Sequence, residues 1–157
     1  MASESVPSHE KESRDLLRRC ESAGLGFFVK AARAAGLETL LSEGGPFTLL
    51  VPADEAFFAL PRGVMKQLLH VPEYLNNVLR NHVIPAKLTS EELCGLQQVR
   101  SITGRLIPVN SYRGILRLEG ALLRDTNIAA SNGIVHVLDA VLMIRADFTK
   151  NDQEEDL

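Results

Sequence analysis

The sequence has no tryptophan, and aromatic residues make up only 5% of its 157 positions. A carbohydrate-binding site built from stacked aromatic rings is therefore not expected. Basic residues are not in excess either, because the formal net charge is -3 at pH 7. Nucleic-acid-binding domains usually present a basic face, so the composition argues against a nucleic-acid partner.

Long hydrophobic runs are also missing. No stretch reaches the roughly 18 consecutive apolar residues from which a transmembrane helix is predicted, so we expect no transmembrane segment. Residues 1–19 are polar and charged and lack the apolar core of a signal peptide. Two interpretations stay open: either the protein remains in the cytoplasm, or a leader has been removed from it.

Cysteine and metal-ligand patterns are equally sparse. Cys20 and Cys94 are the only cysteines and lie far apart, which favours two buried free thiols over a single disulfide. The four histidines have no close metal-ligand spacing with one another or with the cysteines. The hydrolase motif Gly-x-Ser-x-Gly does not occur. The sequence therefore predicts no metal site, no cofactor and no enzymatic activity.

The first half of the chain does contain helical spacing of apolar residues. Apolar side chains recur three and four positions apart within residues 16–20, 27–35, 37–41, 64–69 and 74–82. Gly36, Gly44 and Pro72 stand where helices are expected to stop. These segments predict a group of short amphipathic helices.

Residues 47–51 form an apolar run rich in strand formers, and the features around it predict a rigid corner. Thr48 and its neighbours suit a half-buried pleated surface. Pro52 ends the run because it has no N–H to donate to a neighbouring strand. Asp54 is positioned to cap the following helix, which includes Phe57, because a carboxylate accepts hydrogen bonds from the free N–H groups at a helix start.

The second half of the chain changes to short strands separated by turns. Asn132 and Gly133 form a turn pair that tolerates positive φ, and the strand after them is apolar on both faces, so we expect burial on both sides. Pro108 marks its strand as an edge or a bulge. The predicted strands cover residues 99–102, 106–109, 115–118, 121–123 and 134–144. Helices followed by a meander of strands predict an α+β domain.

Three polar sites in the second half are assigned structural roles. His136 lies among apolar residues of the last strand, where both ring nitrogens of an imidazole need hydrogen-bond partners. His82 ends an apolar helical stripe, where it can bond the last carbonyls of the helix. Residues 89–92, Thr-Ser-Glu-Glu, have the pattern of a capped helix start.

Three blocks of the sequence follow one another in a specific order. They are Gly-Pro-Phe-Thr-Leu-Leu-Val-Pro-Ala-Asp-Glu-Ala-Phe at 45–57 with Leu60-Pro61, Asn-His-Val-Ile-Pro at 81–85, and Asn-Gly-Ile-Val-His-Val-Leu-Asp-Ala-Val-Leu at 132–142. The series closely resembles the fasciclin (FAS1) domain family, over about residues 26–144. The resemblance implies a wedge-shaped β-sandwich of short strands, with several helices packed on it, mostly from the N-terminal half.

Domain limits follow from the same resemblance. Residues 13–146 are expected to form a single FAS1 domain. Residues 1–12 are expected to be a disordered N-terminal segment, and residues 147–157 an acidic C-terminal tail.

The resemblance also implies a function, because FAS1 domains serve as non-catalytic interaction modules in cell adhesion and in association with the extracellular matrix or cell surface. It places partner contacts on Asn81, His82, Val83, Ile84, Asn127 and Ile128. It gives structural roles to Thr48, Pro52, Asp54, Phe57, Asn132, Gly133 and His136. An extracellular or cell-surface location is implied by the family, with the cytoplasm as the alternative.

Two positions depart from the family pattern. Asn81 stands where the family has the tyrosine of a Tyr-His pair, and Asn127 stands where some animal members have the aspartate of an Asp-Ile pair. Integrins recognise an acidic oxygen that binds a metal ion, and an amide oxygen is a poorer ligand for a hard cation. We therefore expect a protein partner but not integrin binding. A small hydrophobic ligand or a glycan is the alternative partner, and the oligomeric state stays open.

Overall fold

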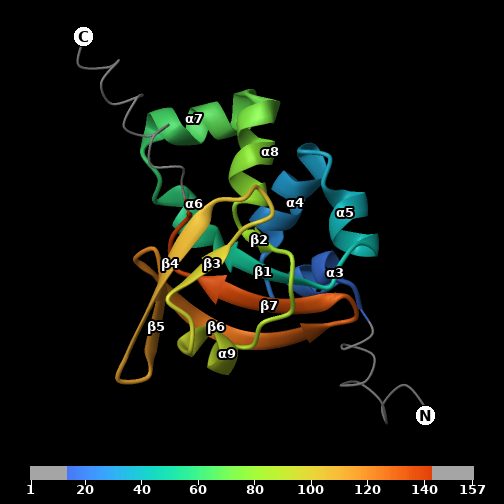
Figure 1. Cartoon of the computed structure of the whole chain (residues 1–157). Helices are drawn as coiled ribbons and strands as arrows, with labels where there is room; N and C mark the ends of the chain where they lie inside the picture. The colour runs from blue at the N-terminus through green and yellow to red at the C-terminus, as the bar shows by residue number, and fades with distance from the viewer. Residues whose placement is uncertain (1–13, 143–157) are drawn as a thin grey trace.

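A seven-stranded sheet forms the centre of the computed structural model, which describes residues 14–142 (Figure 1). Its strands are β1 (Phe47–Pro52), β2 (Val83–Ile84), β3 (Gln98–Arg100), β4 (Leu106–Tyr112), β5 (Ile115–Leu118), β6 (Ala121–Ala130) and β7 (Gly133–Leu138). The order is β2-β1-β7-β6-β5-β4-β3, in which β1 and β7 run parallel and all other neighbours are antiparallel. The predicted segments 1–12 and 147–157 lie outside the described residues.

The sheet bends so far that its two edge strands, β2 and β3, approach each other. The N–H of Ile102, just after β3, donates to the carbonyl oxygen of Val83 in β2 at 2.8 Å. The first and last strands of the sheet order are therefore joined, and the sheet is nearly closed like a barrel. The predicted α+β class is confirmed.

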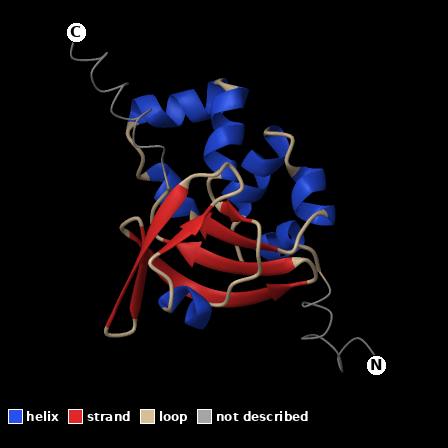
Figure 2. Cartoon of the chain, in the orientation of Figure 1, coloured by secondary structure: helices blue, strands red, loops and turns tan. Residues whose placement is uncertain are grey.

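Most helices come from the first half of the chain, as predicted. They are α3 (Leu16–Ser22), α4 (Gly26–Ala34), α5 (Glu38–Glu43), α6 (Asp54–Phe58), α7 (Arg62–His70) and α8 (Pro72–Arg80), followed by α9 (Ser90–Cys94). Helices α3 to α8 gather on one side of the sheet, and α9 lies apart from them, beside β4 (Figure 2).

The strands β1 and β7 are buried along their whole length, which confirms that β7 is covered on both sides. Leu49, Val51 and Val135 face the cluster that the helices cover, whereas Leu50 and Leu138 face a second cluster inside the bent sheet. Alternate side chains of one strand point to opposite faces, so this central pair separates and supports both clusters.

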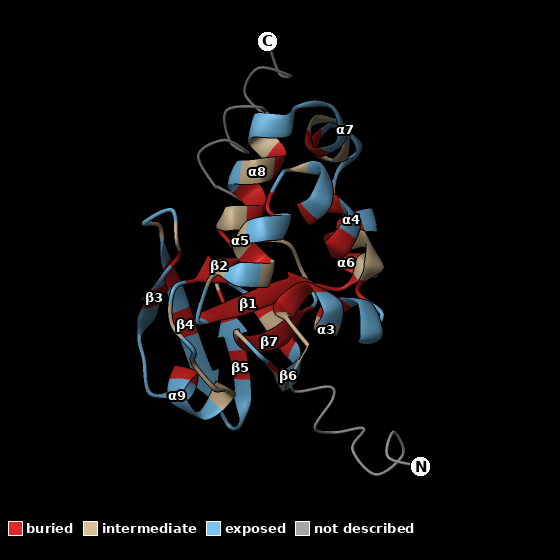
Figure 3. Cartoon of the chain, turned by 90° about the vertical axis from the view of Figure 1, so that its right-hand side faces the viewer, coloured by how far each residue is buried: buried red, intermediate tan, exposed pale blue. Residues whose placement is uncertain are grey.

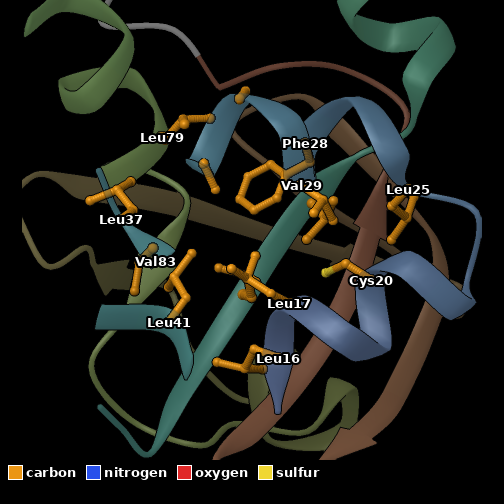
Figure 4. Packing of buried hydrophobic residues seen from close by; sticks show 14 of the residues in the cluster. Leu16, Leu17, Cys20, Leu25, Phe28, Val29, Leu37, Leu41, Leu79 and Val83 are labelled. Carbon is orange, nitrogen blue, oxygen red and sulfur yellow. The ribbon is translucent and has the colours of Figure 1, made fainter. Parts of the chain in front are cut away.

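Large apolar side chains from several helices fill the space above β1 (Figure 4). Leu17, Phe28, Leu41 and Leu79 are among those that are fully or almost fully buried. Each contributes about 1.5–3 kcal/mol relative to an exposed side chain. The same side chains that gave the helical spacing in the sequence thus form this core.

Cys20 lies in the same cluster, whereas Cys94 is exposed, and both thiols are free. The expectation of two buried thiols is therefore correct for only one of them. Burial raises the pKa of Cys20 to about 12, which keeps this thiol protonated and unreactive.

Asp54 does not cap its own helix, contrary to the prediction. It is the first residue of α6, and Ala53 occupies the N-cap position. The Asp54 carboxylate accepts a hydrogen bond from the N–H of Phe27 at 3.0 Å, near the start of α4. The N-cap residue of α4 provides no side-chain cap, so Asp54 supplies the missing acceptor from a distant part of the chain.

Aromatic packing strengthens the same junction. The rings of Phe27 and Phe57 lie with their centroids 4.6 Å apart, and Phe57 is fully buried. The corner after β1 is therefore tied to α4 by one charged hydrogen bond and one ring contact.

The strands predicted at 99–102 and 106–109 are found at Gln98–Arg100 and Leu106–Tyr112, and two further strand predictions differ more. The strand predicted at 121–123 is longer, because β6 continues to Ala130 through the polar residues 124–127. The strand predicted at 134–144 ends at Leu138, and residues 143 and 144 lie outside the described residues.

Pro108 lies neither on an edge strand nor in a bulge, because β4 pairs with β3 and β5 in continuous register. Its carbonyl oxygen accepts from the N–H of Glu119, just beyond the end of β5. The nitrogen and oxygen of one residue in an antiparallel strand point to the same side. The missing N–H therefore faces the turn between β5 and β6 and leaves no strand group unpaired.

Asn132 joins three elements that are far apart in the sequence. Its Oδ1 accepts from the N–H of Leu16 at 3.0 Å, and its Nδ2 donates to the carbonyl oxygens of Leu41 and Gly44, each at 2.8 Å. Its own carbonyl oxygen accepts from the N–H of Phe47 at 3.1 Å. The Asn132 side chain thus fixes the start of α3 and the end of α5, and its backbone carbonyl fixes the start of β1.

Gly133 allows β1 and β7 to approach, which gives a first testable prediction. A Cβ at this position would lie 2.0 Å from the carbonyl oxygen of Phe47, whereas a Cβ at Gly24 would have no atom within 4 Å. We expect Gly133→Ala to lower the free energy of unfolding by more than about 3 kcal/mol, because the central strand pair must separate. Gly24→Ala should cost only about 1–2 kcal/mol, the cost of positive φ. Urea unfolding of both variants checks this, and equal losses would contradict it.

Candidate partner-binding surface

The predicted contact residues Asn127 and Ile128 lie on an irregular part of β6. The register of β6 against β7 shifts between Leu123 and Asp125, and again between Asp125 and Ile128. Asn127 has a φ of 59°, a left-handed conformation that asparagine tolerates better than most residues. Residues 124–127 are exposed and Ile128 is half-buried. We call residues 124–128 the β6 bulge.

The His136 ring connects the β6 bulge to the chain segment before α9. Its Nδ1 accepts a hydrogen bond from the N–H of Asn127 at 3.0 Å, and its Nε2 lies 2.8 Å from the carbonyl oxygen of Leu88. Because a carbonyl only accepts, Nε2 carries the proton in the neutral ring. Burial lowers the pKa of His136, so the ring is neutral at neutral pH. Both ring nitrogens are therefore occupied by backbone groups.

The first residues of α9 form hydrogen bonds with Asn127 of the β6 bulge. The Oδ1 of Asn127 accepts from the N–H of Ser90 at 2.9 Å, and its Nδ2 donates to the Oγ of Ser90 at 3.0 Å. The same Nδ2 lies 3.4 Å from Oε1 of Glu91. Thr89 and Glu92 form a capping box at this helix start, in line with the pattern seen in the sequence.

An amide suits position 127 better than a carboxylate does. Asn127 uses its oxygen for a backbone N–H and its nitrogen for a hydroxyl and a carboxylate. A carboxylate has no donor and would face Glu91 with like charge. The pKa of Glu91 is lowered, first by a hydrogen bond from its own backbone N–H and also by the side chains of Ser90, Asn127 and Thr89. The departure from the family pattern at this position therefore has a local structural reason.

A small hollow lies beside the β6 bulge. Its volume is about 200 Å³, and its lining combines apolar side chains such as Leu25 and Ile128 with the charged residues Glu55, Arg124 and Asp125. Arg124 and Glu55 approach to 3.9 Å, and both are substantially exposed, so their pairing is weak. The hollow offers mixed apolar and charged contacts next to Asn127.

The other predicted contact residues, Asn81, His82, Val83 and Ile84, are all buried, with Asn81 only 1% exposed. The Oδ1 of Asn81 accepts from the hydroxyl of Thr103 at 2.8 Å. In the sheet order, β1 and β7 separate β2 from β6. The structure therefore does not bring this segment together with Asn127, and a direct contact with a partner would require the segment to open.

His82 bonds two backbone groups in the opposite tautomer from His136. Its Nδ1 lies 2.8 Å from the carbonyl oxygen of Val78, and its Nε2 accepts from the N–H of Leu142 at 2.8 Å. The proton is therefore on Nδ1. Burial lowers the pKa of His82 to about 4, so this ring is also neutral at neutral pH.

The remaining structural residue in this region is Thr48. Its hydroxyl donates to the carbonyl oxygen of Ala86 at 2.6 Å and accepts from the N–H of Leu88 at 2.7 Å. It therefore fixes the chain between β2 and α9, the same segment whose Leu88 carbonyl orients His136.

The histidines and acids of the described chain do not form a reactive cluster. Within residues 14–142, no group of three or more His, Cys, Asp or Glu side chains is arranged to hold a metal ion. His82 and His136 bond only to backbone groups there. The arrangement supports the shape of the protein and the presentation of the β6 bulge.

Comparison with known proteins identifies the family. Residues 23–144 match the family model described as the Fasciclin domain. The chain belongs to the fasciclin (FAS1) family. It has the FAS1 fold, because a FAS1 domain pair from the insect cell adhesion molecule Fasciclin I matches with a TM-score of 0.65 and 17% identity, covering 85% of this chain and 52% of that chain.

Sequence relatives within the FAS1 family differ greatly in length. The Synechocystis protein sll1735 is 36% identical over 116 residues, which cover 74% of this chain and 86% of the relative. The transforming growth factor-beta-induced protein ig-h3 of Sus scrofa is 30% identical over 114 residues, which cover 72% of this chain but only 17% of the relative. Human periostin matches with 27% identity over 14% of its length. The FAS1 domain is thus shared with adhesion-type proteins that are much longer.

No helix between residues 14 and 142 has both the length and the hydrophobicity needed to cross a bilayer.

Several contacts at this surface were not predicted from the sequence. The links from Asn127 to Ser90 and to His136 join positions far apart in the chain. The resemblance identified Asn127, but nothing in the sequence pattern indicated which element would hold it.

The buried His82 gives a prediction about pH. Its pKa is about 4 in the folded protein and about 6.5 when unfolded, so the unfolded chain takes up a proton first as the pH falls. The contribution of neutral His82 to the free energy of unfolding is complete above about pH 6.5. It falls as the pH drops through about 4, and the whole loss is about 3 kcal/mol. His82→Gln should flatten this loss in urea unfolding between about pH 7 and pH 4.5, with His136 causing the remaining slope. His70→Gln, at an exposed histidine on α7, is the control, and equal slopes in all three proteins would contradict the prediction.

The contact between Asn127 and Glu91 gives a third prediction. Asn127→Asp should lower the urea midpoint at pH 7, because a carboxylate replaces a donor beside Glu91. Adding Glu91→Gln should restore much of the loss by removing the like charge. A loss that is unchanged by the second substitution would show that repulsion by Glu91 is not its cause.

Proposed function

We propose that this chain is a non-catalytic interaction module that works in adhesion or association at the cell surface or in the extracellular matrix. The observation that supports this most is the β6 bulge, which is exposed but held by hydrogen bonds to His136 and α9. A surface that is rigid before binding loses little conformational freedom when a partner binds. The protein partner contacts the β6 bulge and the hollow beside it.

The family supports the same proposal. FAS1 domains occur in ig-h3 and periostin, and one structural relative is described as a cell adhesion molecule. The details of the surface argue against metal-mediated integrin binding. The Oδ1 of Asn127 already accepts from Ser90, and an amide oxygen is a weak ligand for a hard cation.

A small hydrophobic ligand or a glycan is less well supported. The hollow beside the β6 bulge has a volume of about 200 Å³, which is below the range of about 300–1,000 Å³ typical of small-molecule sites. A larger hollow of about 500 Å³ is lined mostly by the polar residues Glu73, Asn76 and Asn77 of α8, which do not suit a hydrophobic ligand. Native mass spectrometry of freshly purified protein tests this alternative, because a retained ligand adds a fixed mass.

The proposal is tested by binding with a matched pair of variants. Thr126→Arg places a bulky charge on the β6 bulge, and Thr39→Arg places the same charge on the exposed face of α5. Immobilised proteins are exposed to surface proteins extracted from the cells that produce the chain. We expect Thr126→Arg to reduce capture of the partner at least about tenfold, while Thr39→Arg keeps it. Equal capture by both variants would contradict the assignment of the β6 bulge.

A further inference from the structure

The outer face of β3, β4 and β5 is a second surface, distinct from the β6 bulge. Along β4 the side chains alternate, with Ile107 and Val109 buried and Leu106, Asn110 and Tyr112 exposed. The inward side chains join the apolar cluster inside the bent sheet. The outward side chains face away from that cluster, as strand geometry requires.

The strand register places further residues on the same face. Arg100 of β3 pairs with Leu106, Arg117 of β5 pairs with Asn110, and Ile115 pairs with Tyr112. Paired residues of antiparallel strands project from the same side of the sheet. Arg113 lies in the turn between Tyr112 and Ile115. We call Arg100, Leu106, Tyr112, Arg113, Ile115 and Arg117 the arginine face.

The helices of the described chain leave the arginine face open: α9 lies beside β4, but its buried Leu93 belongs to the cluster inside the bent sheet. Figure 3 shows exposed residues along β3, β4 and β5, with helices α3 to α8 away from these strands. Leu106 is 43%, Tyr112 69% and Ile115 50% exposed. Tyr112 and Ile115 are register neighbours, and Leu106 lies six residues away along β4 on the same face. Exposed apolar side chains on one face are typical of interaction sites, and tyrosine and arginine are enriched in protein interfaces.

The positive charges of this face have no carboxylate partner among residues 14–142. Nη1 of Arg100 donates to the carbonyl oxygen of Gly104 at 2.9 Å, and Nη1 of Arg117 donates to that of Gly120 at 3.2 Å. The Arg113 guanidinium lies 5.2 Å from the centre of the Tyr112 ring. The nearby Glu119 is already paired with Arg105. Three cations thus gather on one face of a chain whose net charge is -3.

We propose that the arginine face binds an acidic polypeptide segment of a partner protein, with apolar side chains between its carboxylates. Guanidinium groups bind carboxylates through paired hydrogen bonds, and the apolar side chains of such a segment would cover Leu106, Tyr112 and Ile115. A second copy of this chain docked face to face would oppose like charges, which costs energy. Charge complementarity therefore favours an acidic partner over self-association.

The test uses the full chain and a short fluorescent peptide in which Glu and Asp alternate with Leu and Phe. The test variant is Arg100→Gln with Arg117→Gln. The control is Arg62→Gln with Lys66→Gln, which removes the same charge from exposed positions of α7. Fluorescence anisotropy at low ionic strength should show binding that is at least about tenfold weaker in the test variant and unchanged in the control. A peptide with Gln and Asn in place of the acids should not bind.

Backbone amide NMR shifts then locate the peptide, and matching urea midpoints verify that both variants fold. Shifts at residues 100, 106 and 112–117 support the proposal. Shifts confined to the β6 bulge would overturn it while leaving the proposed function intact. Equal binding by the test and control variants, or binding of a heparin fragment but not of the acidic peptide, would also overturn it.

Discussion

The parallel pairing of β1 with β7 is the constraint on which the other elements depend. It joins residues 47–52 to residues 133–138 in continuous register, and it supports the helix-covered cluster on one face and the sheet-enclosed cluster on the other. Asn132 and Gly133 set where this pairing begins, one through its hydrogen bonds to three elements and the other through the absence of a side chain. The positions of α3, α5 and β1 are therefore linked to a single turn.

Three buried polar side chains and the half-buried Asn132 bond mainly to backbone atoms. Thr48, His82, His136 and Asn132 bond the chain where regular strand or helix pairing stops. These side chains supply partners for backbone groups, because irregular backbone inside a protein has donors and acceptors without regular strand or helix partners. This bonding is consistent with the structural roles that the sequence predicted for Thr48, His82, Asn132 and His136. We therefore propose that recognition falls to outward-facing segments of residues 14–142, among them the β6 bulge and the arginine face.

The sequence could predict what depends on local pattern. Helical spacing, the apolar character of β1 and β7 and the Asn132-Gly133 turn all reflect neighbours in the chain. The predictions were wrong where the conformation or role of a residue depends on a partner far away in the sequence. Asp54 resembled a local cap but caps α4, because the fold brings Phe27 to it. Residues 124–127 lie outside the predicted strand 121–123 because they are polar, yet β6 continues through them, with Asp125 paired to Val137 of β7.

The chain order of the central strands has a consequence for synthesis. Phe47 emerges from the ribosome long before its neighbour Gly133, and the contacts between distant segments must wait for loop closure. The apolar helices and β1 therefore leave the ribosome without the strand that completes their shared core. Until β7 has been made, the nascent chain exposes apolar surface of the kind that chaperones protect, so the early half of this protein depends on its cellular surroundings more than the finished fold does.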